Sequence, residues 1–180
     1  MPASSTASPP LHDLIARTRT GDAAALGELY ARHARPLLAL ARRLTGSAAD
    51  AEDVLHDVFL GLPEALRRYD ERGTLEAWLK RVTARVALNR LRARGGSREV
   101  PLAEVPNASG PADALDVLAL QGAIDALPDA LRVVLVLKEI EGYSHAEVAA
   151  LLDITRGASE VRLHRAVAAL RRRLGGEAHP

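Results

Sequence analysis

Residues 144–174, SHAEVAALLDITRGASEVRLHRAVAALRRRL, decide the fold of this chain, and their pattern predicts a helix-turn-helix. Ser144 and Glu147 have the S-x-x-E spacing of a capping box, in which two side chains satisfy free backbone N–H groups, so a short helix is expected to begin here. Asp153 to Thr155 interrupt the apolar pattern, and Thr155 is placed to cap a second helix. Two helices joined by so few residues must cross steeply.

The second helix of this pair is strongly basic. Its apolar positions are Ala158, Val161, Leu163, Ala166 and Leu170. A basic helix in this setting has the charge pattern of a helix docked on DNA phosphates, and an amphipathic helix with a solvated arginine face is the alternative. The N-terminal residues of a docked second helix reach base edges, while flanking cations hold the backbone. The residues predicted to contact DNA are Ser144, Arg156, Ser159, Glu160, Arg162, His164 and Arg165.

Composition limits the classes of protein that the chain can be. Its 180 residues are 48% hydrophobic but only 3% aromatic, which favours cores of Leu, Val and Ala packed between helices. Cysteine is absent, which excludes disulfides, cysteine-based zinc sites and thiol catalysis. We find no signal peptide and no apolar run long enough to span a bilayer, so a cytoplasmic location is expected. The net charge of +1 hides segregated charges, whose local fields matter more than their sum.

Helical patterns separated by loop residues predict an all-α fold of two small helical domains joined by a flexible linker. A short helix is expected over 11–18, and a longer one between Gly21 and Gly46, in which Pro36 is expected to cause a bend or mark a boundary. A further helix is expected from Leu75 to about Arg94. The predicted organisation is a disordered tail over 1–10, a helical domain over 11–94, a linker over 95–114 and a helix-turn-helix domain over 115–175.

A cluster of acidic residues opens the helix predicted after Ser47. The helix dipole favours carboxylates at a helix start and so explains part of the cluster, but not Asp57, which lies a turn further on. The cluster has neither the spacing of an EF-hand nor a histidine that completes a zinc motif, so no metal is expected. The carboxylates predicted to form a surface for a basic protein partner are Asp50, Glu52, Asp53 and Asp57.

A second basic surface is predicted in the first half of the chain. No acidic residue interrupts residues 80–98, and a solvated helix face normally mixes the two signs, so phosphate contact is favoured. Trp78 is in phase with Leu75, Leu79 and Val82 and is expected in the core rather than as a platform for base stacking. The cations of the run are Lys80, Arg81, Arg85, Arg90, Arg92, Arg94 and Arg98.

Four segments carry a resemblance to a known family. They are residues 21–46, GDAAALGELYARHARPLLALARRLTG; residues 50–62, DAEDVLHDVFLGL; residues 73–94, GTLEAWLKRVTARVALNRLRAR; and residues 126–174, from ALPDALRVVLVLKEIEGY through the stretch quoted first. In this order they resemble the two-domain extracytoplasmic-function sigma factors of bacterial RNA polymerase. The similarity runs from about Leu11 to Leu174, and the predicted linker lies where that family has one.

The resemblance implies a role for each surface and no cofactor. The acidic helix is expected to bind the clamp helices of the largest subunit of core RNA polymerase. The helix-turn-helix is expected to read the minus-35 promoter element, and the loop that begins at Tyr69 and the helix after it to recognise and help melt the minus-10 element. An anti-sigma factor that covers these faces is a further expected partner. The residues that the resemblance assigns to minus-10 recognition are Tyr69, Lys80, Arg81, Arg85, Asn89 and Arg92.

Several positions depart from the family pattern. His56 stands where the family commonly has glutamine, Arg85 where it has asparagine and Asn89 where it has aspartate. Residues 157–161, GASEV, also differ from the usual start of the recognition helix. Glu160 can accept a hydrogen bond from a cytosine amino group but repels phosphates, so base contacts cannot be copied from relatives.

Two other classes of protein remain as alternatives. A stand-alone transcriptional regulator would use the same helix-turn-helix without polymerase, and the acidic helix argues against it. An enzyme is the second alternative, but the sequence contains no P-loop, H-E-x-x-H motif, nucleophile elbow or Gly-rich dinucleotide turn.

Overall fold

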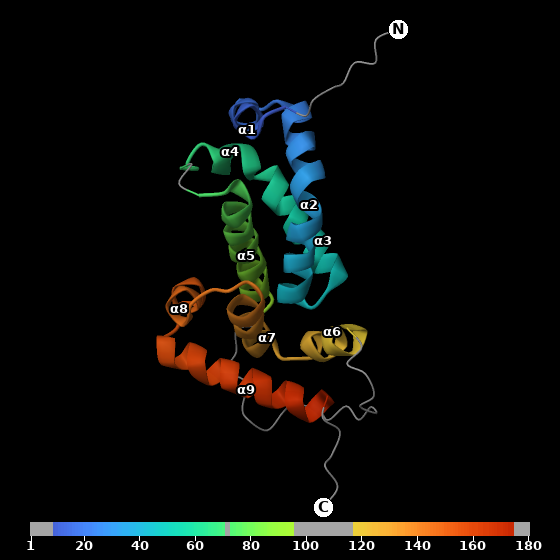
Figure 1. The fold of residues 1–180 in the computed structure, drawn as a ribbon, viewed down its shortest axis with the longest axis vertical. Coiled ribbons are helices and arrows are strands. Elements are labelled where there is room, and N and C mark those ends of the chain that lie inside the picture. Colours follow the sequence, from blue (N-terminus) through green and yellow to red (C-terminus); the bar gives the residue numbers. More distant parts are fainter. Residues whose placement is uncertain (1–8, 71–72, 96–116, 175–180) are drawn as a thin grey trace, which may run out of the picture.

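The computed structural model describes residues 9–70, 73–95 and 117–174, and every regular element among them is helical (Figure 1). The first domain consists of α1 (Leu11–Arg19), α2 (Ala23–Thr45), α3 (Ala48–Leu60), α4 (Leu62–Leu66) and α5 (Leu75–Ala93). The second consists of α6 (Val117–Asp125), α7 (Asp129–Leu135), the π-helical turn η1 (Val136–Ile140), α8 (His145–Leu152) and α9 (Arg156–Leu174). The predicted all-α fold with two helical domains is confirmed. The predicted tail and linker lie almost wholly outside the described residues.

The helices begin where the sequence places capping side chains. The Ser47 hydroxyl accepts a hydrogen bond from the Asp50 amide at 3.3 Å, and the Thr74 hydroxyl accepts one from the Ala77 amide at 3.2 Å. Each bond satisfies one of the backbone donors that a helix start leaves free. These caps set the starts of α3 and α5, the two helices that carry the predicted sites of the first domain.

The second helix does not have the boundary that was one of the two outcomes expected at Pro36. Pro36 neither ends nor divides α2, which is one helix from Ala23 to Thr45. Leu37, Leu40 and Leu44 follow the proline and are all buried, so packing offsets the backbone hydrogen bond that proline cannot donate. The helix that begins after Pro128 consists of α7 and the π-helical turn η1, which continues it to Ile140, just before Gly142.

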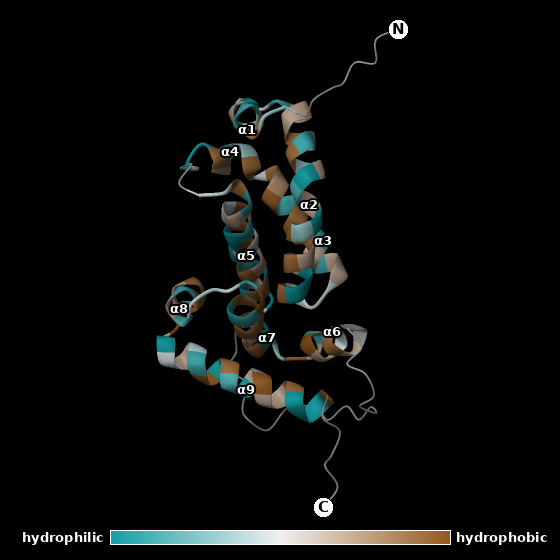
Figure 2. Cartoon of the chain, viewed as in Figure 1, coloured by the Kyte–Doolittle hydropathy of each residue, from teal (hydrophilic) through white to brown (hydrophobic). Residues whose placement is uncertain are grey.

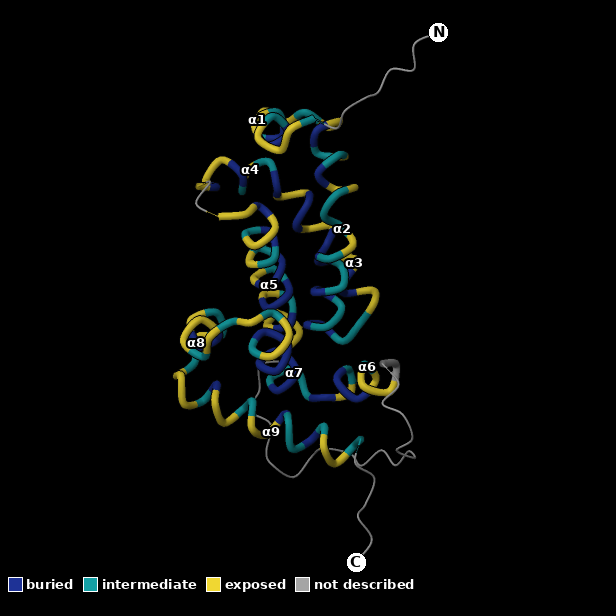
Figure 3. Tube along the Cα trace, viewed as in Figure 1, coloured by how far each residue is buried: buried dark blue, intermediate teal, exposed yellow. Residues whose placement is uncertain are grey.

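The core is aliphatic, as the low aromatic content predicts. Polar and apolar residues alternate around the helices (Figure 2), and buried residues gather where α2, α3 and α5 face one another (Figure 3). Leu29, Leu44, Val54 and Leu79 are each 0% exposed. Burying a side chain of this kind stabilises the fold by about 1.5–3 kcal/mol. The helix from Leu131 to Leu137 is buried on all sides, which places it between the first domain and α9.

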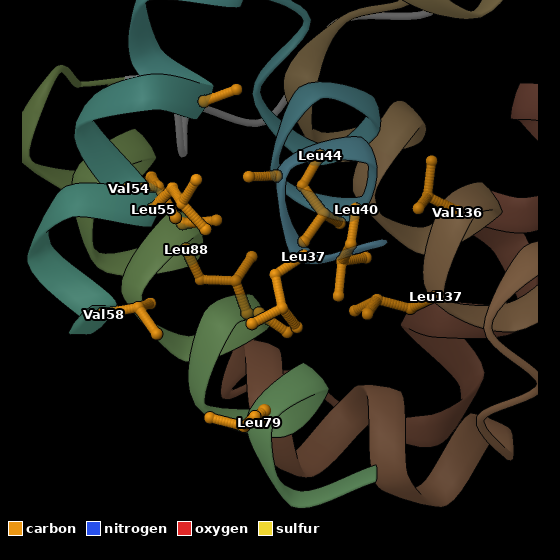
Figure 4. Close-up of a cluster of buried hydrophobic side chains, with 14 of the residues drawn as sticks. Leu37, Leu40, Leu44, Val54, Leu55, Val58, Leu79, Leu88, Val136 and Leu137 are labelled. Carbon is orange, nitrogen blue, oxygen red and sulfur yellow. The ribbon is translucent and has the colours of Figure 1, made fainter. Parts of the chain in front are cut away.

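The two domains pack against each other through α2 and the α7–η1 helix. Figure 4 shows Leu137 pointing toward Leu40 of α2. Beside this apolar contact, the guanidinium of Arg132 lies against Gly46, the residue that ends α2 with a φ of 70°. A Cβ atom at Gly46 would lie 2.8 Å from Cζ of Arg132. Glycine is therefore required here both by the left-handed backbone and by the close approach of the second domain.

Candidate nucleic-acid interface

The acidic residues of α3 do not share one environment. Glu52, Asp53 and Asp57 are exposed, and the side chains of Asp53 and Asp57 are 56% and 52% exposed. Asp50 is 1% exposed. It lies four and eight residues before the buried Val54 and Val58, a spacing that places all three on one face of the helix. This helical spacing from Val54 and Val58 can be read from the sequence, and it distinguishes Asp50 from the other three carboxylates.

Arg90 of α5 and Arg94, the residue that follows α5, satisfy the buried Asp50. Arg90 donates to one carboxylate oxygen at 3.4 Å, and Arg94 donates to the other. Arg90 also forms ion pairs with Asp53 and, at 3.8 Å, with Asp57. A buried carboxylate is stable only when it is paired and hydrogen-bonded. Asp50 therefore ties α3 to α5, while the outer carboxylates stay at the surface.

The charge of Asp50 depends on these contacts. Burial acts to raise the pKa of its carboxyl, but hydrogen bonds from Arg94, Ser47 and Arg90 and the positive charge of Arg94 outweigh it, so the pKa lies below its ordinary value. A group with a lowered pKa in the folded state stabilises the fold above its unfolded pKa, and that stabilisation is lost as the pH falls.

We expect Asp50→Asn to lower the free energy of unfolding at pH 7 by about 1–2 kcal/mol, because Arg90 and Arg94 lose a charged acceptor while remaining partly solvated. The wild type should lose this contribution as the pH falls below about 4, the region in which an unfolded aspartate takes up its proton. The difference between variant and wild type should therefore shrink in acid. Urea unfolding between pH 3 and 7 measures this, with Asp53→Asn as the exposed control that should cost less.

The structure divides the basic run on α5 into two faces. Arg90 and Arg94 turn toward α3, whereas Arg81, Arg85, Asn89 and Arg92 are exposed at intervals of four, four and three residues, which places them along one stripe of the helix. Arg98 lies outside the described residues. The exposed stripe brings together four of the six residues predicted for the minus-10 element. The sequence alone did not separate the two faces, because the run carries arginine on both.

The other two predicted residues lie beside this stripe. Tyr69 is 8% exposed, its hydroxyl donates to the Gly73 carbonyl at 3.3 Å, and its ring centroid lies 4.9 Å from that of Trp78. Trp78 is partly buried against the core, as expected. Lys80 is half-buried and forms an ion pair with Glu141 of the second domain at 3.3 Å. Tyr69 thus holds the end of the loop through its hydrogen bond to Gly73. Lys80 lies at the boundary between the two domains.

The predicted helix-turn-helix is confirmed as α8 and α9. Ser144 and Glu147 form the full capping box: the Ser144 amide donates to the Glu147 carboxylate at 2.8 Å, and the Glu147 amide donates to the Ser144 hydroxyl at 3.2 Å. Asp153 ends α8 in the left-handed conformation, with a φ of 56°. The Thr155 hydroxyl accepts from the Ala158 amide at 3.1 Å and caps α9. The Ser144 hydroxyl is therefore engaged in holding the start of α8.

Two residues of α9 lie on faces opposite to those expected from their polarity. Ser159 is 0% exposed, and its Oγ lies 2.9 Å from Nδ1 of His145. This hydrogen bond joins the two helices of the motif. Val161, assigned to the apolar side, is 49% exposed. The buried stripe runs through Ser159, Ala166 and Ala169, and Val161 lies across the helix from it. Val161 is therefore an exposed apolar side chain, which the sequence analysis had assigned to the buried side of the helix.

The remaining predicted residues of α9 differ in exposure. His164 and Arg165 are exposed on the same side as Val161. Arg156 donates to Glu160 at 2.9 Å in an exposed pair one turn apart, so the carboxylate that would repel phosphates is partly neutralised by its neighbour. Arg162 is half-buried and lines a cavity of about 40 Å³ together with Arg92 and Asp129.

No helix in the described ranges is long and apolar enough to cross a lipid bilayer.

Comparison with known families divides the chain at the boundary between its two domains. Residues 29–96 match Sigma-70 region 2, and residues 118–170 match Sigma-70 region 4. The chain is 37% identical over 158 residues to the ECF RNA polymerase sigma factor SigE of Mycolicibacterium smegmatis, covering 81% of this chain and 61% of that protein. It therefore spans about three-fifths of the length of this relative. It is 33% identical over 164 residues to SigM of Mycobacterium tuberculosis, covering 91% of this chain and 84% of SigM.

Solved structures share the fold. One is the structure of CnrH in complex with the cytosolic domain of CnrY. The match covers 92% of this chain and 97% of the solved chain, with a TM-score of 0.56 and 30% sequence identity. Another is the structure of the sigma factor RpoE in complex with the anti-sigma factor NepR from Bartonella quintana. The match covers 79% of this chain and 92% of the solved chain, with a TM-score of 0.57 and 23% sequence identity. With both sigma-70 regions present in order and a curated ECF relative matched over most of its length, the chain belongs to the extracytoplasmic-function sigma factors of the sigma-70 family.

Proposed function

We propose that this protein binds core RNA polymerase and directs transcription initiation at promoters with specific minus-10 and minus-35 elements. The observation that carries the proposal is the presence, in one chain, of exposed carboxylates on α3, an exposed basic stripe on α5 and a helix-turn-helix. A stand-alone DNA-binding regulator needs only the last of these. The proposed activity is recognition without catalysis and without a cofactor, in the cytoplasm.

The outer carboxylates of α3 form the proposed polymerase surface. Glu52, Asp53 and Asp57 would contact the clamp helices of the largest subunit. The buried Asp50 supports that surface, because its ion pair with Arg90 keeps the guanidinium within ion-pairing distance of both Asp53 and Asp57. The proposed region 2 domain extends over 11–94, the linker over 95–114 and the region 4 domain over 115–175. An anti-sigma factor is a further proposed partner, since RpoE and CnrH were each solved with another protein bound.

The two DNA surfaces suit different states of the DNA. The stripe of Arg81, Arg85, Asn89 and Arg92 offers cations and an amide to a melted strand, with Lys80 beside it and Tyr69 supporting the preceding loop. The exposed side of α9 would enter the major groove of a duplex. Ser144 and Ser159 shape the motif rather than reaching bases. The proposed minus-35 contacts are Arg156, Glu160, Val161, Arg162, His164 and Arg165.

Run-off transcription with core polymerase tests this function. Templates from a library of promoter fragments are transcribed with and without the protein. Specific transcripts that require the protein, with shared sequences at minus-10 and minus-35, are the expected result. DNA binding without polymerase and without transcripts would favour the stand-alone regulator and would leave the acidic surface without its proposed partner.

Arg162→Ala tests how the second domain reads DNA. If Arg162 contacts a base edge, the substitution should cost about 1–3 kcal/mol of binding free energy and relax the preference at one position. If it holds a phosphate, all sequences should weaken alike. Titration of promoter variants separates these outcomes, and unchanged binding to every variant would remove Arg162 from the interface.

A further inference from the structure

The second helix of the helix-turn-helix carries one carboxylate among many cations. Residues 154–174 contain six arginines and a single acidic residue, Glu160. Glu160 is the fifth residue of α9 and therefore lies within about 8 Å of the start of the helix, the part that reaches base edges in a docked helix-turn-helix. A carboxylate at this place repels phosphates and weakens binding to DNA of any sequence. It can strengthen binding only by accepting a hydrogen bond from a base.

The carboxylate of Glu160 has a fixed neighbour. Nε of Arg156 donates to Oε1 of Glu160 at 2.9 Å, and the two side chains are 74% and 48% exposed. An exposed pair of this kind contributes less than about 1 kcal/mol to stability, so its main effect is on orientation. The bond engages Oε1 and offsets part of the negative charge, while a carboxylate accepts hydrogen bonds at both of its oxygens. Oε2 is thus the oxygen that the pair leaves for a base.

The next residue is apolar but adds little to the core. Val161 is 49% exposed, although other apolar residues of α9, such as Ala166 and Ala169, are 0% exposed. An exposed valine forgoes most of the stabilisation that burial would give it. The apolar group that base pairs present in the major groove is the C5 methyl of thymine, and an exposed aliphatic side chain is its ordinary partner.

The packing of α9 determines which residues face outward. The helix lies against α6, α7 and α8, and Figure 3 shows its exposed positions on the side turned away from α7. Ser159 is buried and bound to His145 of α8, which fixes the rotation of α9 about its own axis. Glu160, Val161 and His164 lie on the opposite side of the helix and are all exposed. The carboxylate and the valine are therefore presented together on the face that would enter a groove.

We propose that α9 reads a cytosine through Glu160 and a nearby thymine methyl through Val161. The cytosine amino group is a donor that a carboxylate can accept from, whereas the amino group of adenine lies beside the acceptor N7, which repels a carboxylate. Consecutive Cα atoms are about 3.8 Å apart and base pairs about 3.4 Å apart, so the two bases lie within about two base pairs of each other. The inference rests on the proposed function only in that α9 contacts duplex DNA.

Glu160→Gln tests the cytosine contact. A library of short duplexes with a randomised central block is incubated with the full-length protein, with and without core RNA polymerase, and the bound DNA is sequenced. The wild type should enrich cytosine at one position. Glu160→Gln should enrich adenine there, because an amide has the donor and the acceptor that match N7 and the amino group of adenine. We expect the ratio of cytosine to adenine at that position to change at least about tenfold.

Glu139→Gln is the matched control for charge. Glu139 is an exposed carboxylate of η1 in the same domain, and its substitution changes the net charge equally. This variant should keep the base preference of the wild type. Tighter binding of Glu160→Gln to all sequences, with an unchanged preference, would assign Glu160 to repulsion of phosphates and overturn the base contact. The absence of any enriched sequence with the wild type would overturn it as well.

Deoxyuridine tests the thymine contact. It lacks the C5 methyl of thymine but keeps every hydrogen-bonding group. Replacement of the enriched thymine should weaken wild-type binding about threefold to fourfold, as expected for one buried methyl group. Val161→Ala should bind the thymine duplex more weakly and should lose this sensitivity, whereas deoxyuridine outside the enriched block should have no effect on either protein. Equal sensitivity of Val161→Ala and the wild type would remove Val161 from the contact.

This inference and the proposed function fail separately. Promoter-specific transcripts together with an unchanged base preference in Glu160→Gln would support the sigma activity and contradict the base contact. A change from cytosine to adenine in duplexes bound without polymerase, in the absence of transcripts, would support the base contact and contradict the sigma activity.

Discussion

Replacement of Asp53 and Asp57 by arginine together is expected to abolish binding to core RNA polymerase while leaving the fold intact. Both side chains are more than half exposed, so their charges are available to a partner. Reversing two charges in a complementary interface places like charges together at a cost of several kcal/mol, and a loss of affinity of at least about 100-fold should follow. The fold should persist because the buried Asp50 still holds Arg90 and Arg94.

Pull-down with core polymerase and circular dichroism measure the two parts of this prediction. Asp13→Arg with Glu28→Arg is the control, because each of these carboxylates likewise pairs with an arginine, in their case one helical turn away, and neither belongs to the acidic cluster of α3. Asp53→Asn with Asp57→Asn should fall between the wild type and the double reversal. Full polymerase binding by the folded Asp53→Arg, Asp57→Arg variant would contradict the polymerase assignment of α3.

Arg132→Met is expected to have the largest effect on stability. Arg132 of α7 is 3% exposed, and its guanidinium donates to the Leu44 carbonyl of α2 at 3.2 Å and to the Thr45 carbonyl at 3.0 Å. It also donates to the Leu127 carbonyl at 2.7 Å and to the Asp125 carbonyl at 3.2 Å. Methionine fills similar volume but leaves these buried acceptors unsatisfied, and Asp129 loses its ion pair. We expect the free energy of unfolding to fall by about 3 kcal/mol.

Urea unfolding at pH 7 measures this loss. Arg67→Met is the control, since Arg67 pairs with Glu64 at 3.1 Å but is 64% exposed, and such a pair contributes less than about 1 kcal/mol. A change no larger than that of Arg67→Met would show that the buried guanidinium is dispensable.

Local signals in the sequence predicted most of the helices. The capping box of Ser144 and Glu147 and the cap at Thr155 act within a few residues of themselves, so spacing alone is enough to place α8 and α9. Pro36 shows the limit of such signals, since the packing of α2 overrides a local preference against helix. The short α4 and the π-helical form of η1 carried no comparable pattern and were not predicted.

The sequence by itself determined the helical class, the two domains with their helix-turn-helix, and the resemblance to sigma factors, because caps and apolar periodicity are local properties. Only the tertiary structure decided which charges face a partner. Asp50 and Ser159 are polar residues turned inward, and Val161 is an apolar residue turned outward. The contact of Arg132 with the carbonyls of Leu44 and Thr45 joins residues 88 and 87 positions apart. Every residue has a backbone carbonyl, so such a contact leaves no pattern in the sequence and exists only once the two domains have packed.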